Sequence, residues 1–242
     1  MKDNAHLTID EHKFATGYNL ISDFVYGGID GAVTTFAVVS GVEGASLSVP
    51  IILIIGFANL FGDGFSMSVG KYLSDKSELE QYEKIKQVEF NHLTQKTQHE
   101  MNEVREIMAN YGFKGNDLDS AVKIITSNPE AWVDLMMRNE FNMTHENVSP
   151  VKGALVTFVS FVLVGFIPLI GYTFKSFINI DSQQMFYVTI ITTLLALFVV
   201  GAIKSKFSVK HWIMCGFETA LIGGVAAAIA YGVGYFIKGI LG

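Results

Sequence analysis

Long runs of apolar residues separated by short polar connections occupy both ends of the chain. Five of these runs approach or exceed the roughly 20 residues that an α-helix needs to cross a bilayer core. They cover residues 20–42, 49–72, 152–174, 185–203 and 212–237. Pro168 lies inside the third run and should kink it, because proline cannot donate the helical hydrogen bond. The pattern predicts an all-α protein with five transmembrane helices.

A polar segment, residues 73–148, separates the second apolar run from the third and holds 14 of the chain's 23 acidic residues. Thr97 and Glu100 have the spacing of a capping box, and Pro129 follows Asn128 as proline does at a first helical position. We expect three or four short amphipathic helices here, and the first should continue directly from the second transmembrane helix.

The apolar and polar segments divide the chain into three parts. Residues 1–72 form an N-terminal arm and the first two spans, residues 73–148 form an acidic helical domain, and residues 149–242 form the last three spans. Lysine and arginine gather in the arm, in the acidic segment and between the fourth and fifth spans. Because basic residues are retained on the cytosolic side, we expect a cytosolic N-terminus, a cytosolic insert and an outer C-terminus.

Composition supports the membrane assignment and excludes several classes of protein. Half of the 242 residues are hydrophobic and only 17% are charged, so lipid must cover the surplus apolar surface. Cys215 is the only cysteine, which excludes a thiolate metal cluster. The net charge of −6 argues against a nucleic-acid partner. No hydrolase or nucleotide-binding motif is present, so we expect no enzyme and no organic cofactor.

Two of the predicted spans carry polar side chains that could contact a cation. Asp30 lies midway along the first span, where an ionisable group is unfavourable unless it faces a partner, a cavity or an ion path. In the second span Asn59, Asp63 and Met67 follow one another at intervals of four, on one helix face. This set suits Fe²⁺ better than Mg²⁺ or Ca²⁺. Taken one at a time, each residue has an alternative role. Asp30 could be a structural carboxylate, Met67 could pack in an apolar core, and Asn59 could form a hydrogen bond to another helix.

The glycines around Asp30 allow two interpretations. Gly27, Gly28 and Gly31 flank Asp30 and either admit the backbone of another helix or leave room for an ion. Asp23 and Glu218 lie near span ends, where a structural role is the simpler interpretation.

The acidic segment carries potential ligands at spacings that place them on common helix faces. They are Glu89, His92, Glu100, Glu103, Met136, Met137 and Glu140. A solvated acidic face often gives the same spacing, and the two methionines beside Trp132 could equally belong to a hydrophobic core. The other histidines show no spacing that demands a metal.

Four motifs together resemble the vacuolar iron transporter family, which includes the yeast calcium-sensitivity-complementing vacuolar transporters and many bacterial members. They are DFVYGGIDGAVTTFAVVSG, GDGFSMSVGKYLSDKSE, NPEAWVDLMMRNE and GFIPLIGY, and the resemblance extends over nearly the whole chain. It implies a homodimer with five spans per subunit that exchanges cytosolic Fe²⁺ for protons along a path between the subunits.

The resemblance also assigns roles to residues. Asp30 is similar to the pathway carboxylate and Met67 to the pathway thioether, and the acidic segment's candidates match the family's cytosolic ligands. His92 and Asn59 stand where the plant-type pattern has glutamates. Asp63, one turn from Asn59, could substitute for the second of these.

The leading prediction is proton-coupled export of Fe²⁺ across a membrane, expected to be a bacterial plasma (inner) membrane. Mn²⁺, Co²⁺, Ni²⁺ and Zn²⁺ are further candidate ions, and the expected partners are metal ions, protons, membrane lipid and a second copy. Asp30 would couple the ions, because a carboxylate binds either a cation or a proton. Two alternatives remain: a metal-gated channel, and a membrane-anchored di-iron oxidase built on Glu89 and His92.

Overall fold

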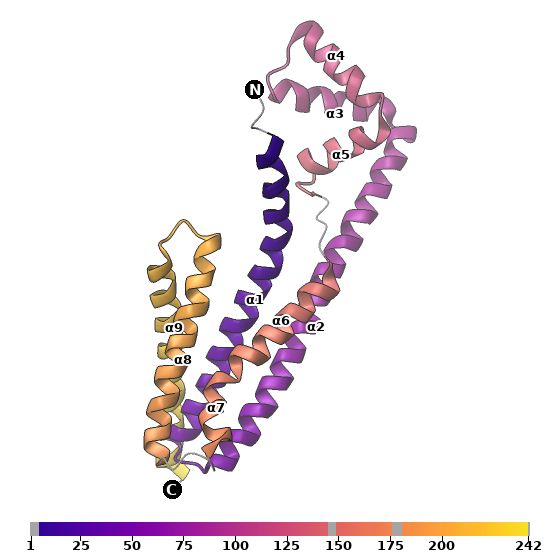
Figure 1. Cartoon of the computed structure of the whole chain (residues 1–242). Coiled ribbons are helices and arrows are strands. Elements are labelled where there is room, and N and C mark those ends of the chain that lie inside the picture. Colours follow the sequence, from indigo (N-terminus) through magenta and orange to yellow (C-terminus); the bar gives the residue numbers. More distant parts are fainter. Residues whose placement is uncertain (1–4, 145–148, 176–180, 242) are drawn as a thin grey trace. The chain divides into compact units, whose positions relative to one another are not determined.

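The computed structural model describes the backbone of residues 5–144, 149–175 and 181–241, and side chains from residue 20 onward within these ranges, except at residues 207 and 241. The first four residues of the predicted arm and residues 145–148, at the end of the predicted insert, lie outside the described residues. Within the described ranges every regular element is helical, and no strand occurs. The elements are α1 (Ala5–Gly44), α2 (Val49–Gln95), α3 (Thr97–Asn110), α4 (Gly115–Thr126), α5 (Pro129–Asn139), α6 (Pro150–Gly165), α7 (Ile167–Thr173), α8 (Ser182–Lys204), the 3-10 turn η2 (Ser205–Phe207) and α9 (Trp212–Leu241) (Figure 1).

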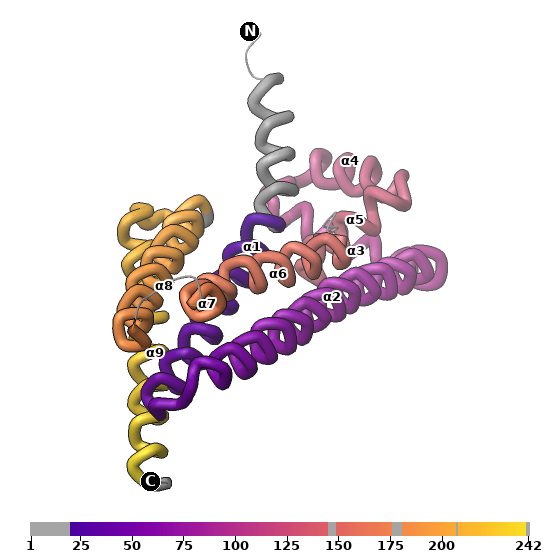
Figure 2. The backbone as a smooth tube through the Cα atoms, turned by 60° about the horizontal axis from the view of Figure 1, so that its bottom comes forward, coloured from indigo at the N-terminus to yellow at the C-terminus, as the bar shows by residue number. Residues whose placement is uncertain are grey.

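The chain divides into two compact units. One, here called the membrane unit, comprises Met1–Leu73 and Val148–Gly242, and the other, the acidic unit, comprises Ser74–Asn147. Helix α2 is continuous from the first unit into the second (Figure 2), which confirms that a helix of the insert extends directly from the second span.

Among the described residues, four helices are long and apolar enough to cross a membrane, and a fifth span results if the bent pair α6–α7 is counted as one. The two helices of that pair meet at an angle of 47°. The break at Phe166 precedes Pro168 by two residues, where the missing proline N–H interrupts the helical hydrogen bonds. The predicted kink is therefore confirmed.

Helix α1 packs against α6, α8 and α9 in the membrane unit. A Cβ atom at Gly31 would overlap the carbonyl oxygen of Phe161, and one at Gly27 would lie 2.5 Å from the carbonyl oxygen of Thr157. At Gly28 it would lie 3.0 Å from the Val164 side chain. These glycines therefore allow the close approach of α6. Of the two roles that the sequence left open, the structure supports helix packing and not room for an ion.

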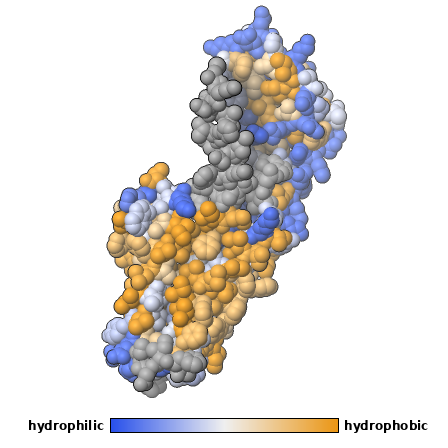
Figure 3. All heavy atoms as spheres, in the orientation of Figure 1, coloured by the Kyte–Doolittle hydropathy of each residue, from blue (hydrophilic) through white to orange (hydrophobic). Residues whose placement is uncertain are grey.

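The outward faces of the membrane unit are apolar. Among the described residues, large side chains are more than half exposed on α1, α2, α6, α8 and α9, for example Phe65 on α2, Leu195 on α8 and Phe236 on α9. Apolar residues cover most of the face of this unit seen in Figure 3, whereas hydrophilic residues are frequent on the acidic unit. Such a surface requires lipid.

The acidic unit packs α3, α4 and α5 around a small apolar core that includes Val104, Trp132 and Met136. Helix α5 begins at Pro129, as predicted, and the Asn128 side chain accepts hydrogen bonds from the backbone N–H groups of the next turn at 3.1 and 3.4 Å.

The predicted capping box at the start of α3 is wrong. The Thr97 hydroxyl donates to the Leu93 carbonyl oxygen of the preceding helix at 2.6 Å and caps nothing. The Glu100 side chain is buried among other ionisable groups instead of reaching back to the helix start.

Candidate metal sites

Three potential ligands from two helices converge in the acidic unit. Glu89 and His92 lie one turn apart near the end of α2, and Glu100 lies in the first turn of α3, which follows after a break at Lys96. One ligand atom from each of the three residues lies within 4.8 Å of the others. The His92 Nδ1 atom is 3.5 Å from Glu89 Oε1 and 3.6 Å from Glu100 Oε1. We call these three residues the triad.

Both carboxylates of the triad are buried and incompletely paired. Glu89 and Glu100 are only 2% and 3% exposed, and the Oε2 atom of each lacks a hydrogen-bond partner among the described residues. Burial raises the pKa of Glu89, and the nearby His92 partly offsets this effect. Burial also raises the pKa of Glu100, and the carboxylates of Glu103 and Glu89 raise it further. A bound cation would relieve this unfavourable ionisation.

Further ionisable groups surround the triad. The Glu103 side chain hydrogen-bonds that of Glu100, and Glu103 Oε1 lies 3.3 Å from His99 Nε2. Partial desolvation, followed by the charges of Glu103 and Glu89, raises the pKa of Glu140 at the end of α5. The structure thus brings together the five predicted non-methionine ligands. It also places His99 beside Glu103, a histidine that the sequence interpretation set aside although its interval of four to Glu103 was visible.

Met136 and Met137 are completely buried in apolar surroundings. Met136 belongs to a cluster with Val104 and Trp132, and Met137 to one with Tyr82 and Val133. Their packing accounts for their burial, and their role as ligands stays a prediction.

In the membrane unit, the Asp30 carboxylate is half-buried. The Thr34 hydroxyl bonds the Asp30 carbonyl oxygen at 2.8 Å, and the Thr35 hydroxyl is buried without a partner in the described part of the chain. No hydrogen bond or ion pair to the Asp30 carboxylate occurs among the described residues. Asp63 lies close enough for its negative charge to act on Asp30. Two carboxylates that repel one another could share a cation or a proton.

The three candidates of α2 differ in their surroundings. Asp63 is exposed, whereas Asn59 and Met67 are partly buried. The Asn59 side-chain nitrogen has no hydrogen-bond partner among the described residues, and Met67 packs against an apolar cluster that includes Leu60 and Phe161. The four candidates of the spans therefore do not form a closed ligand set within one chain.

The two carboxylates that the sequence suggested to be structural have ion-pair partners. Asp23 lies 3.4 Å from the Lys71 ammonium group, and Glu218 lies 3.0 Å from that of Lys210. These contacts support a structural role for both residues.

Long apolar helices with an apolar outer surface define this chain as an integral membrane protein of several spans. The chain belongs to the VIT family, whose profile matches residues 21–235.

Several proteins similar to this chain are named vacuolar iron transporters. A protein of Centaurea cyanus named vacuolar iron transporter is 34% identical over 224 residues, which are 92% of this chain and 89% of the relative. Vacuolar iron transporter 1 of Arabidopsis thaliana is 32% identical over 228 residues, with the same coverage. The vacuolar iron transporter of Toxoplasma gondii is 32% identical over 238 residues, covering 96% of this chain and 79% of the relative.

Proposed function

We propose that this protein is a proton-coupled transporter that moves Fe²⁺ out of the cytosol. Membership of the VIT family and relatives named for iron transport support transport of a metal ion, and make the chain a transporter instead of an enzyme. The observation that carries the ion-binding step is the triad, where buried carboxylates with unpartnered oxygen atoms meet a histidine. Carboxylate and imidazole ligands suit Fe²⁺ and its first-row neighbours Mn²⁺, Co²⁺, Ni²⁺ and Zn²⁺.

The acidic unit captures cytosolic ions in this mechanism. Glu89, His92 and Glu100 replace part of the hydration shell, and Glu103 and Glu140 add negative charge that attracts the cation. Met136 and Met137 would contribute thioethers only if their packing changed, so we propose them as secondary ligands.

Asp30 and Asp63 carry the coupling step. A cation held between these carboxylates is favoured over protons when both are ionised, and protonation of Asp30 weakens its hold on the ion. Asn59 and Met67 would add an amide oxygen and a thioether along the same helix. Binding of one ion therefore excludes the other, which is the requirement for exchange.

A second copy of the chain completes the path in this proposal. Exposure of Asp63 to hydrocarbon would be unfavourable. Gly62, Ser66 and Gly70 form an exposed small-residue stripe on α2, and a Cβ atom at either glycine would meet nothing. Such stripes permit close helix contacts between membrane proteins. Oxidation should therefore cross-link a Ser66→Cys variant into a dimer, while Leu195→Cys at another exposed position, on α8, should stay monomeric under denaturing conditions.

We infer the direction of transport from the lysine distribution, which favours a cytosolic acidic unit. The proposed location is the plasma membrane of a bacterium. The relatives are named for the vacuole, which is also a destination for ions that leave the cytosol.

Fe²⁺ uptake into proteoliposomes tests the function. Uptake should increase at least severalfold when the side that receives the ion is acidic, and Asp30→Asn should abolish this increase. Asp117→Asn, which changes an exposed carboxylate of α4, is the matched control. Uptake that ignores the pH gradient in the wild type would instead support a metal-gated channel. Oxygen consumption with Fe²⁺ and no uptake would support the di-iron oxidase.

A further inference from the structure

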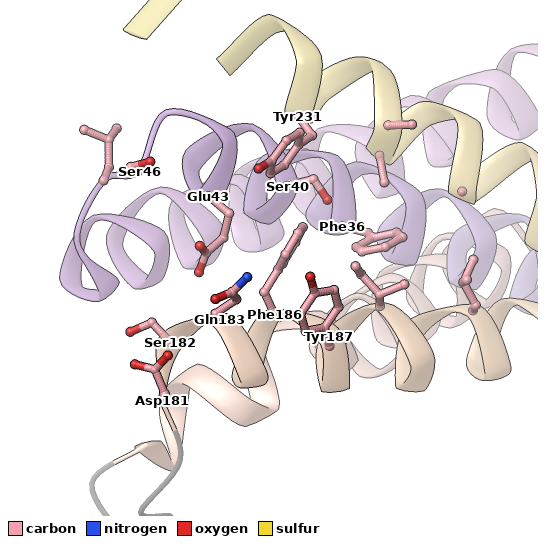
Figure 4. Close-up of a pocket in the computed structure, with 16 residues that line it drawn as sticks. Phe36, Ser40, Glu43, Ser46, Asp181, Ser182, Gln183, Phe186, Tyr187 and Tyr231 are labelled. Atoms are coloured by element: carbon pink, nitrogen blue, oxygen red, sulfur yellow. The ribbon is translucent and has the colours of Figure 1, made fainter. Parts of the chain in front are cut away.

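A cavity of about 900 Å³ lies between α1, α8 and α9 of the membrane unit (Figure 4). It is found where α1 ends and α8 begins, and none of the candidate metal ligands lines it. Its volume is in the range of cavities that bind organic ligands. The cavity is therefore a feature that ion transport through Asp30 does not explain.

The lining changes from polar to apolar with distance from the helix ends. On α8 the residues Asp181 and Gln183 at its start are followed by Ile190 and Leu194, two and three turns further along. On α1, Glu43 near the end of the helix is preceded by Phe36 two turns earlier; its carboxylate and the Gln183 amide both point into the space between α1 and α8 (Figure 4). This arrangement matches an amphiphile with a polar head and an apolar chain.

Two carboxylates line the polar end of the cavity, and two ammonium groups outside the lining are hydrogen-bonded to its serines. Glu43 accepts a hydrogen bond from the Tyr172 hydroxyl at 2.8 Å, and Asp181 is exposed. The ammonium groups of Lys175 and Lys238 donate to two serine hydroxyls of the lining, those of Ser182 at 2.6 Å and Ser46 at 2.8 Å. Two carboxylates and two ammonium groups complement a zwitterion better than an ion of either sign.

One buried hydroxyl points to an occupant between the two ends. Ser40 lines the cavity between Phe36 and Glu43 in the sequence and is only 1% exposed. Its Oγ atom has no hydrogen-bond partner among the described residues. A buried hydroxyl without a partner is unfavourable, and an ester oxygen at the boundary between head and chain would satisfy it.

We propose that this cavity binds one zwitterionic phospholipid whose headgroup carries a primary amine. The ammonium group lies at Glu43 and Asp181, the phosphate lies at Ser46 and Ser182 next to the ammonium groups of Lys238 and Lys175, and one acyl chain follows Ile190 and Leu194 along α8. The stacked rings of Phe186 and Tyr231 flank the headgroup, as aromatic side chains do at membrane interfaces. This inference rests on the membrane assignment and is independent of which ion is transported.

Native mass spectrometry of the full-length protein in detergent tests the proposal. The delipidated protein is titrated with phosphatidylethanolamine, phosphatidylcholine and phosphatidylglycerol. One molecule of phosphatidylethanolamine should bind about tenfold more tightly than either of the others, which is the ratio expected for one charge-assisted hydrogen bond. Asp181→Asn, an exposed substitution that should not disturb folding, should remove most of this preference.

A second pair of variants tests the apolar end of the cavity. Ala228→Trp should fill the cavity and abolish tight binding of the lipid, whereas Ile229→Trp, an exposed position outside the lining, should not. If Ala228→Trp does not fold, Gly224→Leu replaces it, because a Cβ atom there would be in ordinary contact with Leu194 at 3.5 Å.

Three results would overturn the proposal. One is equal binding of the three lipids by the wild type. Another is tight binding that persists in a folded cavity-filling variant. The third is the loss of one bound Mn²⁺ ion in Asp181→Asn, in a protein that retains no lipid, since the cavity would then be a cation site.

Discussion

The acidic unit and the membrane unit present their carboxylates in different ways. In the acidic unit Glu89 and Glu100 are buried within one chain and face His92 at 3.5 and 3.6 Å. In the membrane unit Asp63 is exposed, and the Asp30 carboxylate has no hydrogen bond or ion pair among the described residues. The first group could hold a cation within one chain. Under the proposed function, the second group holds the ion more weakly, releases it, and is completed by a second copy.

The largest expected effect comes from the membrane unit. Asp30→Asn should reduce Fe²⁺ uptake into proteoliposomes at least about 100-fold, because a neutral amide can neither hold the cation by charge nor exchange a proton. Co²⁺ binding at the triad, measured in the full-length protein from visible absorption, should stay unchanged. A parallel loss of Co²⁺ binding would show that the two units do not act separately.

The triad should determine affinity. Glu100→Gln should weaken Co²⁺ binding by about 10- to 100-fold, the usual effect of a lost contact at a metal site. It should raise the KM of uptake and leave the maximal rate within about threefold. Glu106→Gln, an exposed change on the same helix, is the control. An unchanged affinity for Co²⁺ would remove Glu100 from the ligand set.

Metal ions should stabilise the protein, and the effect should depend on pH. At a free Mn²⁺ concentration 100 times Kd, the free energy of unfolding should rise by about 2.7 kcal/mol. The raised pKa values of Glu89 and Glu100 mean that the folded metal-free state binds more protons than the unfolded one. Their contribution to stability therefore decreases as pH rises through these pKa values.

Thermal unfolding in detergent checks both effects. The gain in Tm from Mn²⁺ should shrink between pH 7 and pH 5, because protons compete with the ion for the same oxygen atoms. A gain that is equal at both pH values would mean that the ion binds elsewhere.

His92→Glu should alter selectivity more than affinity. Exchange of an imidazole for a carboxylate favours harder ions, so Mn²⁺ should gain about three- to tenfold over Co²⁺ in a competition titration. His99→Glu gives the comparison outside the triad. An equal shift in both variants would indicate a general charge effect.

The smallest effect is expected from the buried methionines. Met136→Leu nearly conserves volume and should lower the free energy of unfolding by less than about 1.5 kcal/mol. Its packing against Val104 and Trp132 suggests a change in Co²⁺ affinity below about threefold. A larger loss, with stability retained, would identify the thioether as a ligand.

The sequence by itself determined the features that depend on neighbours along the chain. Apolar runs of span length, the break before Pro168 and the Asn128–Pro129 helix start all follow from backbone hydrogen bonding and local burial. The candidate ligand pairs of the acidic segment could be predicted for the same reason, since residues three and four apart share a helix face.

The tertiary structure decided what depends on packing between helices. Gly27 and Gly31 allow the close approach of α6, whereas the sequence did not distinguish this role from that of leaving room for an ion. It joined Glu100 to Glu89 and His92 across the break between α2 and α3, and it paired Glu43 with Tyr172 across 129 residues. A helical repeat specifies which residues share a face, but only the packing of side chains determines which two faces meet.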